Sequence, residues 1–304
     1  MSQPRPRVVI VDGVPMSALV AEAPRPRAVV LALHGGGTTA AYFDCPGHPE
    51  SSLLRLGASL GFTVVALDRP GYGSSGPYPE AIALPEQRVR LAFAAVDRIV
   101  GQWPGGAGLF VVAHSNGCEL ALRMAADERG ADLLGIEMAG TGRHYHPAAR
   151  DVLKSASPTY RPPELGELLW HPTQLYPPDV IGGITNSATG AAYEAAMVTA
   201  WPRTDFPALA AQVRVPVQFS VADHERVWQS DAAALAEIGA MFAAAPRFVA
   251  NEQSGAGHNL SLGHTAAAYH LKVLSFAEEC VVAREYPAVG KLTAQKRQAD
   301  LETG

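Results

Sequence analysis

The chain has 304 residues, of which 48% are hydrophobic and 17% charged, and its net charge is −5 at pH 7. This composition is typical of a compact protein with a large core and excludes a disordered chain. The charges are spread without a basic stripe, so we expect no nucleic-acid partner. The three cysteines lie far apart in the sequence, a spacing typical of neither a disulfide framework nor a zinc site.

The sequence contains no segment that indicates secretion or membrane insertion. The N-terminal residues lack an apolar stretch of signal-peptide length. Charged residues, glycines or prolines interrupt each apolar run before it reaches the length of a membrane span. We therefore expect a cytoplasmic protein with no membrane partner.

Short apolar runs alternate with helical patterns along the chain. A hairpin is expected from 8–11 and 17–20, and buried strands at 28–33, 62–67, 109–113, 134–138, 215–221 and 247–250. Apolar residues three or four apart predict helices over 53–60, 87–100, 118–127, 232–242 and 265–283. Apolar runs without alternation suit strands that are buried on both faces. The pattern therefore predicts an α/β fold with a doubly wound, mostly parallel sheet.

One long segment breaks this alternation and predicts the domain organisation. Residues 141–205 are rich in proline and aromatic residues and have weak strand signals, which is typical of a lid or cap. The core then consists of residues 1–140 and 206–283, and residues 284–304 form a polar tail, either frayed or an exposed helix. In the lid, Trp170, Tyr176 and Trp201 could line an apolar substrate pocket or simply attach the lid to the core.

The candidate nucleophile is Ser115. It follows the apolar run 109–113 and opens a helical pattern, as in a nucleophile elbow, where the serine lies on a strained turn between strand and helix. Residues two before and two after the serine must be small because the strand and helix backbones nearly touch, and here they are Ala113 and Gly117. Glycine is usual at the first of these positions, but we expect the turn to tolerate one methyl group. A serine that only caps the helix is the alternative interpretation.

A glycine-rich loop, His34-Gly35-Gly36-Gly37, follows the apolar run 28–33. Glycines let the backbone approach a tetrahedral intermediate without a Cβ in the way. We predict that Gly36, with Gly37 close behind, and Asn116 donate N–H groups to an oxyanion hole. A phosphate-binding loop is less favoured because no Gly-Lys-Ser/Thr follows.

The candidate base is His258, which lies in a flexible Gly-x-Gly loop late in the chain. His114 is next to Ser115, but the elbow should point it away from the hydroxyl. The carboxylate that would orient the base should follow the strand 215–221, where both Asp223 and Glu225 are available.

Together these motifs resemble the α/β-hydrolase superfamily over roughly residues 7–140 and 205–283. The residues that carry the resemblance are His34–Gly37, Asp68-Arg69-Pro70-Gly71-Tyr72-Gly73-Ser74, Ala113–Gly117, Glu225 and Gly257-His258, in the family's order of Ser, acid and His. The acid loop of related enzymes often reads small-x-x-acid, which favours Glu225 over Asp223. The Asp68–Ser74 loop resembles that of the capped branch, which includes esterases and C–C hydrolases.

The resemblance implies a serine hydrolase that cleaves an ester or thioester through an acyl-serine, or transfers the acyl group to another acceptor. The partner is then a small acyl compound, which could be linked to a carrier protein or coenzyme A. Lyase, elimination or cofactor-free oxygenase chemistry, using the base without acylation, is the alternative. Dehalogenases and epoxide hydrolases resemble this family but carry Asp where Ser115 stands. We expect no cofactor and no metal, because the spacing of His144, His146 and Asp151 suits no common ligand set.

Overall fold

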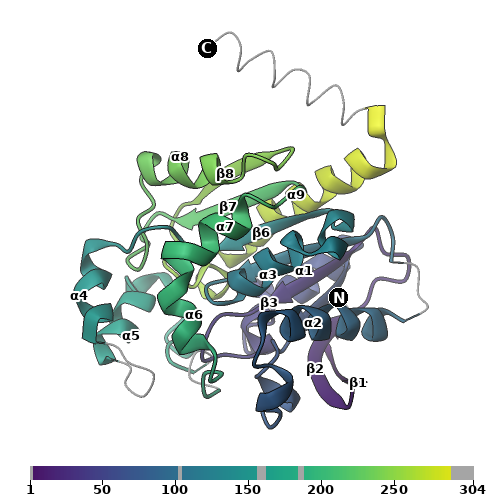
Figure 1. Cartoon of the computed structure of the whole chain (residues 1–304), viewed down its shortest axis with the longest axis horizontal. Helices are drawn as coiled ribbons and strands as arrows, with labels where there is room; N and C mark the ends of the chain where they lie inside the picture. Colours follow the sequence, from purple (N-terminus) through teal and green to yellow (C-terminus); the bar gives the residue numbers. More distant parts are fainter. Residues whose placement is uncertain (1–2, 102–104, 156–161, 184–187, 289–304) are drawn as a thin grey trace.

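A computed structural model describes residues 3–101, 105–155, 162–183 and 188–288 (Figure 1). Eight strands of the chain form one sheet. They are β1 (Arg5–Val11), β2 (Val14–Ala21), β3 (Val29–Leu33), β4 (Thr63–Leu67), β5 (Leu109–His114), β6 (Gly135–Ala139), β7 (Val217–Ala222) and β8 (Phe248–Gln253). Each strand predicted from the sequence is present, with its ends shifted by at most a few residues.

The sheet has the strand order β1-β2-β4-β3-β5-β6-β7-β8. Strand β2 pairs antiparallel with β1 and β4, and all the other pairs are parallel. All residues of β3, β4, β6 and β7 are buried, as expected for strands covered on both faces. The predicted α/β fold with a doubly wound, mostly parallel sheet is therefore confirmed.

The helices among the described residues cover both faces of the sheet and one of its ends. They are α1 (Leu53–Ser59), α2 (Pro85–Val100), α3 (Gly117–Ala126), α4 (Pro147–Ser155), α5 (Pro163–Leu169), α6 (Glu194–Ala200), α7 (Phe206–Ala210), α8 (Ala232–Met241) and α9 (Ala266–Glu285). The core on one face contains residues of α2, α3, α7 and α8, and the core on the other contains residues of α1 and α9. None of the described helices combines the length and apolarity needed to cross a bilayer.

The chain between β6 and β7 carries α4, α5 and α6, which lie together at one end of the sheet (left in Figure 1). No described residue of the predicted lid, 141–205, belongs to a strand. Helix α6 continues through a π-helical turn, Trp201–Asp205, into α7. Prolines 202 and 207 lack the backbone N–H of a regular helix, which accounts for the irregular turn. That this segment moves as a lid remains a prediction, as do the domain boundaries.

Helix α9 ends at Glu285, inside the tail predicted for residues 284–304. Most of that tail, from 289 onward, lies outside the described residues.

Candidate active site

Ser115 lies on a tight turn between β5 and α3. Its φ is 52°, in the left-handed region that residues other than glycine rarely adopt, and its N–H donates to the Ala139 carbonyl at 2.8 Å. A Cβ on Gly117 would lie 2.3 Å from the carbonyl oxygen of Leu33, so only glycine fits where α3 passes β3. The turn forms with the methyl group of Ala113, which is fully buried in the core.

His258 and Glu225 form a buried pair. Nδ1 of His258 lies 3.0 and 3.1 Å from the two carboxylate oxygens of Glu225. Glu225 also accepts the N–H groups of Val227, at 2.7 Å, and Arg226, at 3.0 Å. Burial alone would raise the pKa of Glu225, but the facing His258 and these two N–H groups outweigh burial and lower it. The carboxylate therefore stays charged and fixes the orientation of the imidazole.

His114 connects the base to the nucleophile. Its Nε2 lies 2.9 Å from the carbonyl oxygen of His258, and the two rings are 5.0 Å apart. Burial lowers the pKa of His114 well below its ordinary value, so the ring is neutral. Because a carbonyl oxygen only accepts, Nε2 of His114 carries the proton. His258 is thus held against the residue that precedes Ser115, and since Glu225 faces Nδ1, Nε2 of His258 is the nitrogen that can serve the serine.

Asp223, the alternative to Glu225 as the carboxylate that orients the base, has different hydrogen-bond partners. Its carboxylate accepts the N–H groups of Gly255, at 2.8 Å, and Ala256, at 3.0 Å, and the hydroxyl of Ser254, at 3.2 Å. These residues belong to the loop that carries His258. The structure therefore brings Glu225 to the imidazole, while Asp223 orders the backbone of the histidine loop.

The glycine loop after β3 passes directly beside the nucleophile. A Cβ on Gly35 would lie 3.2 Å from Cβ of Ser115, and a Cβ on Gly36 would lie 2.7 Å from Nδ2 of Asn116. Of the predicted oxyanion donors, Gly37 already donates its N–H to the hydroxyl of Tyr72, at 3.2 Å. Gly36 and Asn116 are therefore the better placed pair.

A buried cluster, made of Arg69, Tyr72 and Glu194, holds this glycine loop in place. Arg69 is fully buried, and its guanidinium donates to the carbonyl oxygens of His34, at 2.5 Å, and Gly35, at 2.9 Å, and to Oε1 of Glu194, at 2.6 Å. Tyr72 donates its hydroxyl to Oε2 of Glu194 at 2.6 Å. Burial raises the pKa of Tyr72 to about 12, so this hydroxyl keeps its proton.

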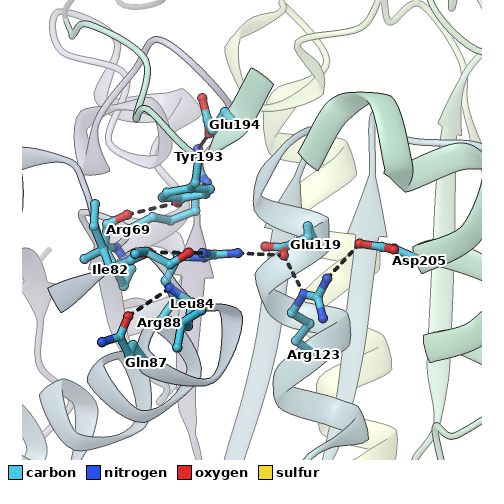
Figure 2. Close-up of polar contacts among 12 residues, drawn as sticks. Arg69, Ile82, Leu84, Gln87, Arg88, Glu119, Arg123, Tyr193, Glu194 and Asp205 are labelled. Carbon is cyan, nitrogen blue, oxygen red and sulfur yellow. Dashed lines mark hydrogen bonds and ion pairs between the residues drawn. The ribbon is translucent and has the colours of Figure 1, made fainter. Parts of the chain in front are cut away.

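Sequence reasoning missed this cluster as a support for the glycine loop. Arg69 and Tyr72 lie in the recognised Asp68–Ser74 motif, but Glu194 lies on α6, in a segment without a motif. Figure 2 shows Glu194 and Arg69 near a second group of paired charges, Arg88, Glu119, Arg123 and Asp205.

A small cavity of about 20 Å³ lies beside Ser115. Its wall is formed by Ser115, Asn116 and Glu119 on one side and by Met197, Val198 and Trp201 of the α6 region on another, and Thr141, Tyr145 and Trp228 complete it. This volume has room for about one water molecule.

The three aromatic residues singled out in the sequence lie in two places. Trp201 is in the cavity wall and donates Nε1–H to the Thr141 hydroxyl at 2.9 Å. Trp170 and Tyr176 pack edge-to-face, 4.9 Å apart, in the core that also contains α1 and α9. Tyr176 also accepts the N–H of Asn259, next to the candidate base, so these two residues attach the segment to the core.

Within the described ranges, no three His, Cys, Asp or Glu side chains are grouped as metal ligands. His144, whose spacing from His146 and Asp151 suits no common ligand set, pairs with Glu237, at 2.8 Å. Cys118 is buried within α3, and burial raises the pKa of its thiol, so this cysteine is protonated and unreactive.

Comparisons with known proteins agree with the fold. The profile of the alpha/beta hydrolase family matches residues 29–269. No curated protein is significantly similar in sequence. Among solved structures, the chain is similar to a thermostable carboxyl esterase from Bacillus coagulans, with a TM-score of 0.63, 18% identity and coverage of 93% of this chain and 100% of the other.

Two further solved structures have a similar fold. An N-acyl homoserine lactonase in complex with N-hexanoyl homoserine has a TM-score of 0.65 and 14% identity, with 91% of this chain and 98% of the other covered. A thioesterase domain from the curacin biosynthetic pathway has a TM-score of 0.59 and 17% identity, with 90% and 99% covered. At such identities the likeness concerns the fold.

Proposed function

The chain belongs to the alpha/beta hydrolase family, and we propose that it is a serine hydrolase that cleaves a small ester or thioester through an acyl-Ser115 intermediate. One observation carries the proposal: the buried Glu225–His258 pair lies against the elbow of a serine with positive φ. Backbone strain of this kind is costly and is typical of functional sites. A serine that only capped α3 would need neither the strain nor the oriented imidazole.

In the acylation step, Oγ of Ser115 attacks the substrate carbonyl carbon while Nε2 of His258 takes the hydroxyl proton. The negative charge that develops on the carbonyl oxygen is stabilised by the N–H groups of Gly36 and Asn116, which flank the serine. The tetrahedral adduct then collapses, the C–O or C–S bond to the leaving group breaks, and His258 returns the proton to the departing oxygen or sulfur. Glu225 stabilises the imidazolium throughout this step.

In the second step, water attacks the acyl-serine with His258 again as the base, and Ser115 regains its proton. The cavity beside Ser115 has room for about one water molecule. Water is the acceptor of that size. The acyl group, or a larger alcohol, amine or thiol as acceptor, needs more room and requires α6 to move away.

Labelling with a fluorophosphonate probe tests the proposal. We expect one adduct on Ser115 by mass spectrometry, together with turnover of short p-nitrophenyl esters, because an activated serine attacks both reagents. The matched Ser115→Ala protein should give neither signal. A folded protein that forms no adduct would instead favour lyase-like chemistry, in which His258 acts without an acyl-serine.

A further inference from the structure

Strand β1 forms one edge of the sheet and, among the described strands, pairs only with β2. Figure 1 shows the β1–β2 hairpin at the margin of the molecule, at the lower right. The strand is apolar on both faces. Val9 and Val11 pack on the core that contains α2, whereas Val8 and Ile10 point the other way and are 59% and 52% exposed. Apolar surface is thus left open on a strand at the edge, where charged side chains usually prevent contact with other chains.

The turn of the hairpin determines which backbone groups of β1 face outward. Asp12 and Gly13 have φ values of 49° and 81°, as in the two-residue turn whose flanking residues exchange hydrogen bonds, here Val11 and Val14. Along an antiparallel pair, every second residue bonds to the partner strand and the others face away from it. The residues of β1 that face away from β2 are Pro6, Val8 and Ile10.

The outward groups of β1 are complementary to those of a second copy. Proline has no N–H, and Arg98 of α2 already donates to the Ile10 carbonyl. The groups left are the N–H groups of Val8 and Ile10 and the carbonyls of Pro6 and Val8. In an antiparallel pairing with Val8 on a two-fold axis, Val8 faces its own copy and Ile10 faces Pro6. Every outward N–H then meets an open carbonyl, so each copy donates two hydrogen bonds to the other.

The side chains fit the same register. Val8 packs against Val8 of the second copy and Ile10 against Pro6, so the exposed apolar residues cover one another. On the other face of the strand, each arginine lies opposite a valine of the second copy, namely Arg5 opposite Val11 and Arg7 opposite Val9. No two like charges therefore face each other directly across the two strands.

The opposite edge of the sheet, β8, has a different character. Its exposed residues are Ala250 and Glu252, and Lys272 of α9 donates to the Glu252 carbonyl at 2.8 Å. A charged side chain on an edge strand discourages pairing with another chain. Edge pairing is therefore expected at β1 and not at β8.

We propose that β1 pairs antiparallel with β1 of a second copy of this chain, with Val8 on the two-fold axis, so that the two sheets join in a homodimer. A closed two-fold contact of this kind also protects an edge that would otherwise be open to any unpaired strand. Ser115 follows β5, in the interior of the sheet, so each copy keeps its own active site.

The mass of the protein in solution tests the dimer. We expect light scattering to give twice the 32.0 kDa of one chain for the wild type, and one chain for Val8→Lys, because two lysines would face each other across the axis. Leu271→Lys is the matched control, since Leu271 is 49% exposed on α9, and it should keep the mass of the wild type. A wild-type mass of one chain at concentrations up to about 1 mM would overturn the proposal.

Cysteine cross-linking tests the register. The Cα atoms of a directly opposite, hydrogen-bonded pair lie about 5.5 Å apart, within the range of a disulfide. Val8→Cys should therefore form a disulfide with its own copy on mild oxidation. In Ile10→Cys the two thiols belong to positions four residues apart along the paired strands, about 14 Å, so this variant should stay unlinked. The three native cysteines are buried and do not compete.

The outcomes distinguish this surface from any other. A dimer that persists in Val8→Lys would be formed elsewhere on the molecule, and equal cross-linking at both positions would mean chance collision or a different register. Either result overturns the proposal. If Val8→Lys does not fold, as circular dichroism would report, the two cysteine variants decide alone.

Discussion

The two halves of the candidate active site are supported by different parts of the molecule. On the base side, Glu225 and Asp223 follow β7 and His258 follows β8, and main-chain N–H groups fix both carboxylates. On the oxyanion side, the glycine loop depends on Arg69, whose charge is paired by Glu194 of α6. The core supplies all the residues of the first half, although Tyr176 and Leu169 of the segment between β6 and β7 also bind Asn259 of the histidine loop. The second half takes one of its own members, Glu194, from that segment.

The pairing of Arg69 with Glu194 also attaches α6 to the core. Removing one partner of a buried ion pair typically costs about 3–5 kcal/mol, because a buried charge is left without compensation. Arg69 is fully buried, so movement of α6 away from the core would leave its guanidinium in that situation. Access for a large substrate and support of the glycine loop are thus opposed in this structure.

Ser115→Ala should have the largest effect because it removes the atom that both halves serve. We expect kcat for p-nitrophenyl esters to fall by about a millionfold, to the level left by binding and the oxyanion hole. The melting temperature should change little, since alanine occupies the same turn with one atom fewer. Substantial turnover in a correctly folded Ser115→Ala protein would contradict acyl-enzyme catalysis.

Glu225→Gln and Asp223→Asn should distinguish two roles within the base side. Loss of the carboxylate that orients the imidazole typically costs about ten-thousandfold in kcat, and we expect that loss for Glu225→Gln. Asp223→Asn only weakens the hydrogen bonds to Gly255 and Ala256, so we expect a loss of about tenfold. Steady-state kinetics of the two variants decides the matter, and the reverse ranking would exchange their roles.

Glu194→Gln tests whether the inserted segment supports the oxyanion side. The variant removes the charge that pairs Arg69, and through Tyr72 it loosens the N–H of Gly37, so we expect kcat to fall by about ten- to a hundredfold with a smaller change in KM. The pH profile of kcat should keep its shape because the base side is untouched.

Glu167→Gln is the matched control for this variant, because Glu167 is exposed on the same inserted segment. It should behave as the wild type in both kcat and melting temperature. A Glu194→Gln protein with a lower melting temperature but an unchanged kcat, measured well below unfolding, would show that the ion pair serves stability alone.

The sequence predicted the base side far better than the oxyanion side, and the reason is physical. The strands, the elbow at Ser115 and the loop of His258 leave local signals, because each follows an apolar run or begins a helical pattern. Arg69 and Glu194 are 125 residues apart, and no local pattern encodes such a contact. Asp223 and Glu225 are only two residues apart, so the strand pattern alone placed both near His258, and only the resemblance favoured Glu225. Their hydrogen bonds separate them in the structure, where Glu225 faces His258 and Asp223 binds the backbone of the histidine loop.

Glu137 on β6 allows a further prediction, which concerns stability. This buried carboxyl receives a hydrogen bond from Tyr269 at 3.1 Å, and no cation among the described residues binds it. Burial raises its pKa from 4.5 to about 8, so it is neutral in the folded protein below that pH. The unfolded chain releases this proton near pH 4.5 and the folded chain only near pH 8, so stability should fall as pH rises through that window. The effect levels off above pH 8.

Glu137→Gln keeps the shape of the side chain and cannot ionise. Thermal unfolding between pH 5 and pH 9 should therefore show the wild type losing stability relative to the variant as pH rises, by up to a few kcal/mol, with no such trend in the difference for the exposed control Glu167→Gln. Parallel curves for wild type and Glu137→Gln would mean that Glu137 ionises in the fold at an ordinary pH, and that burial without a cation does not suffice to keep this carboxyl neutral.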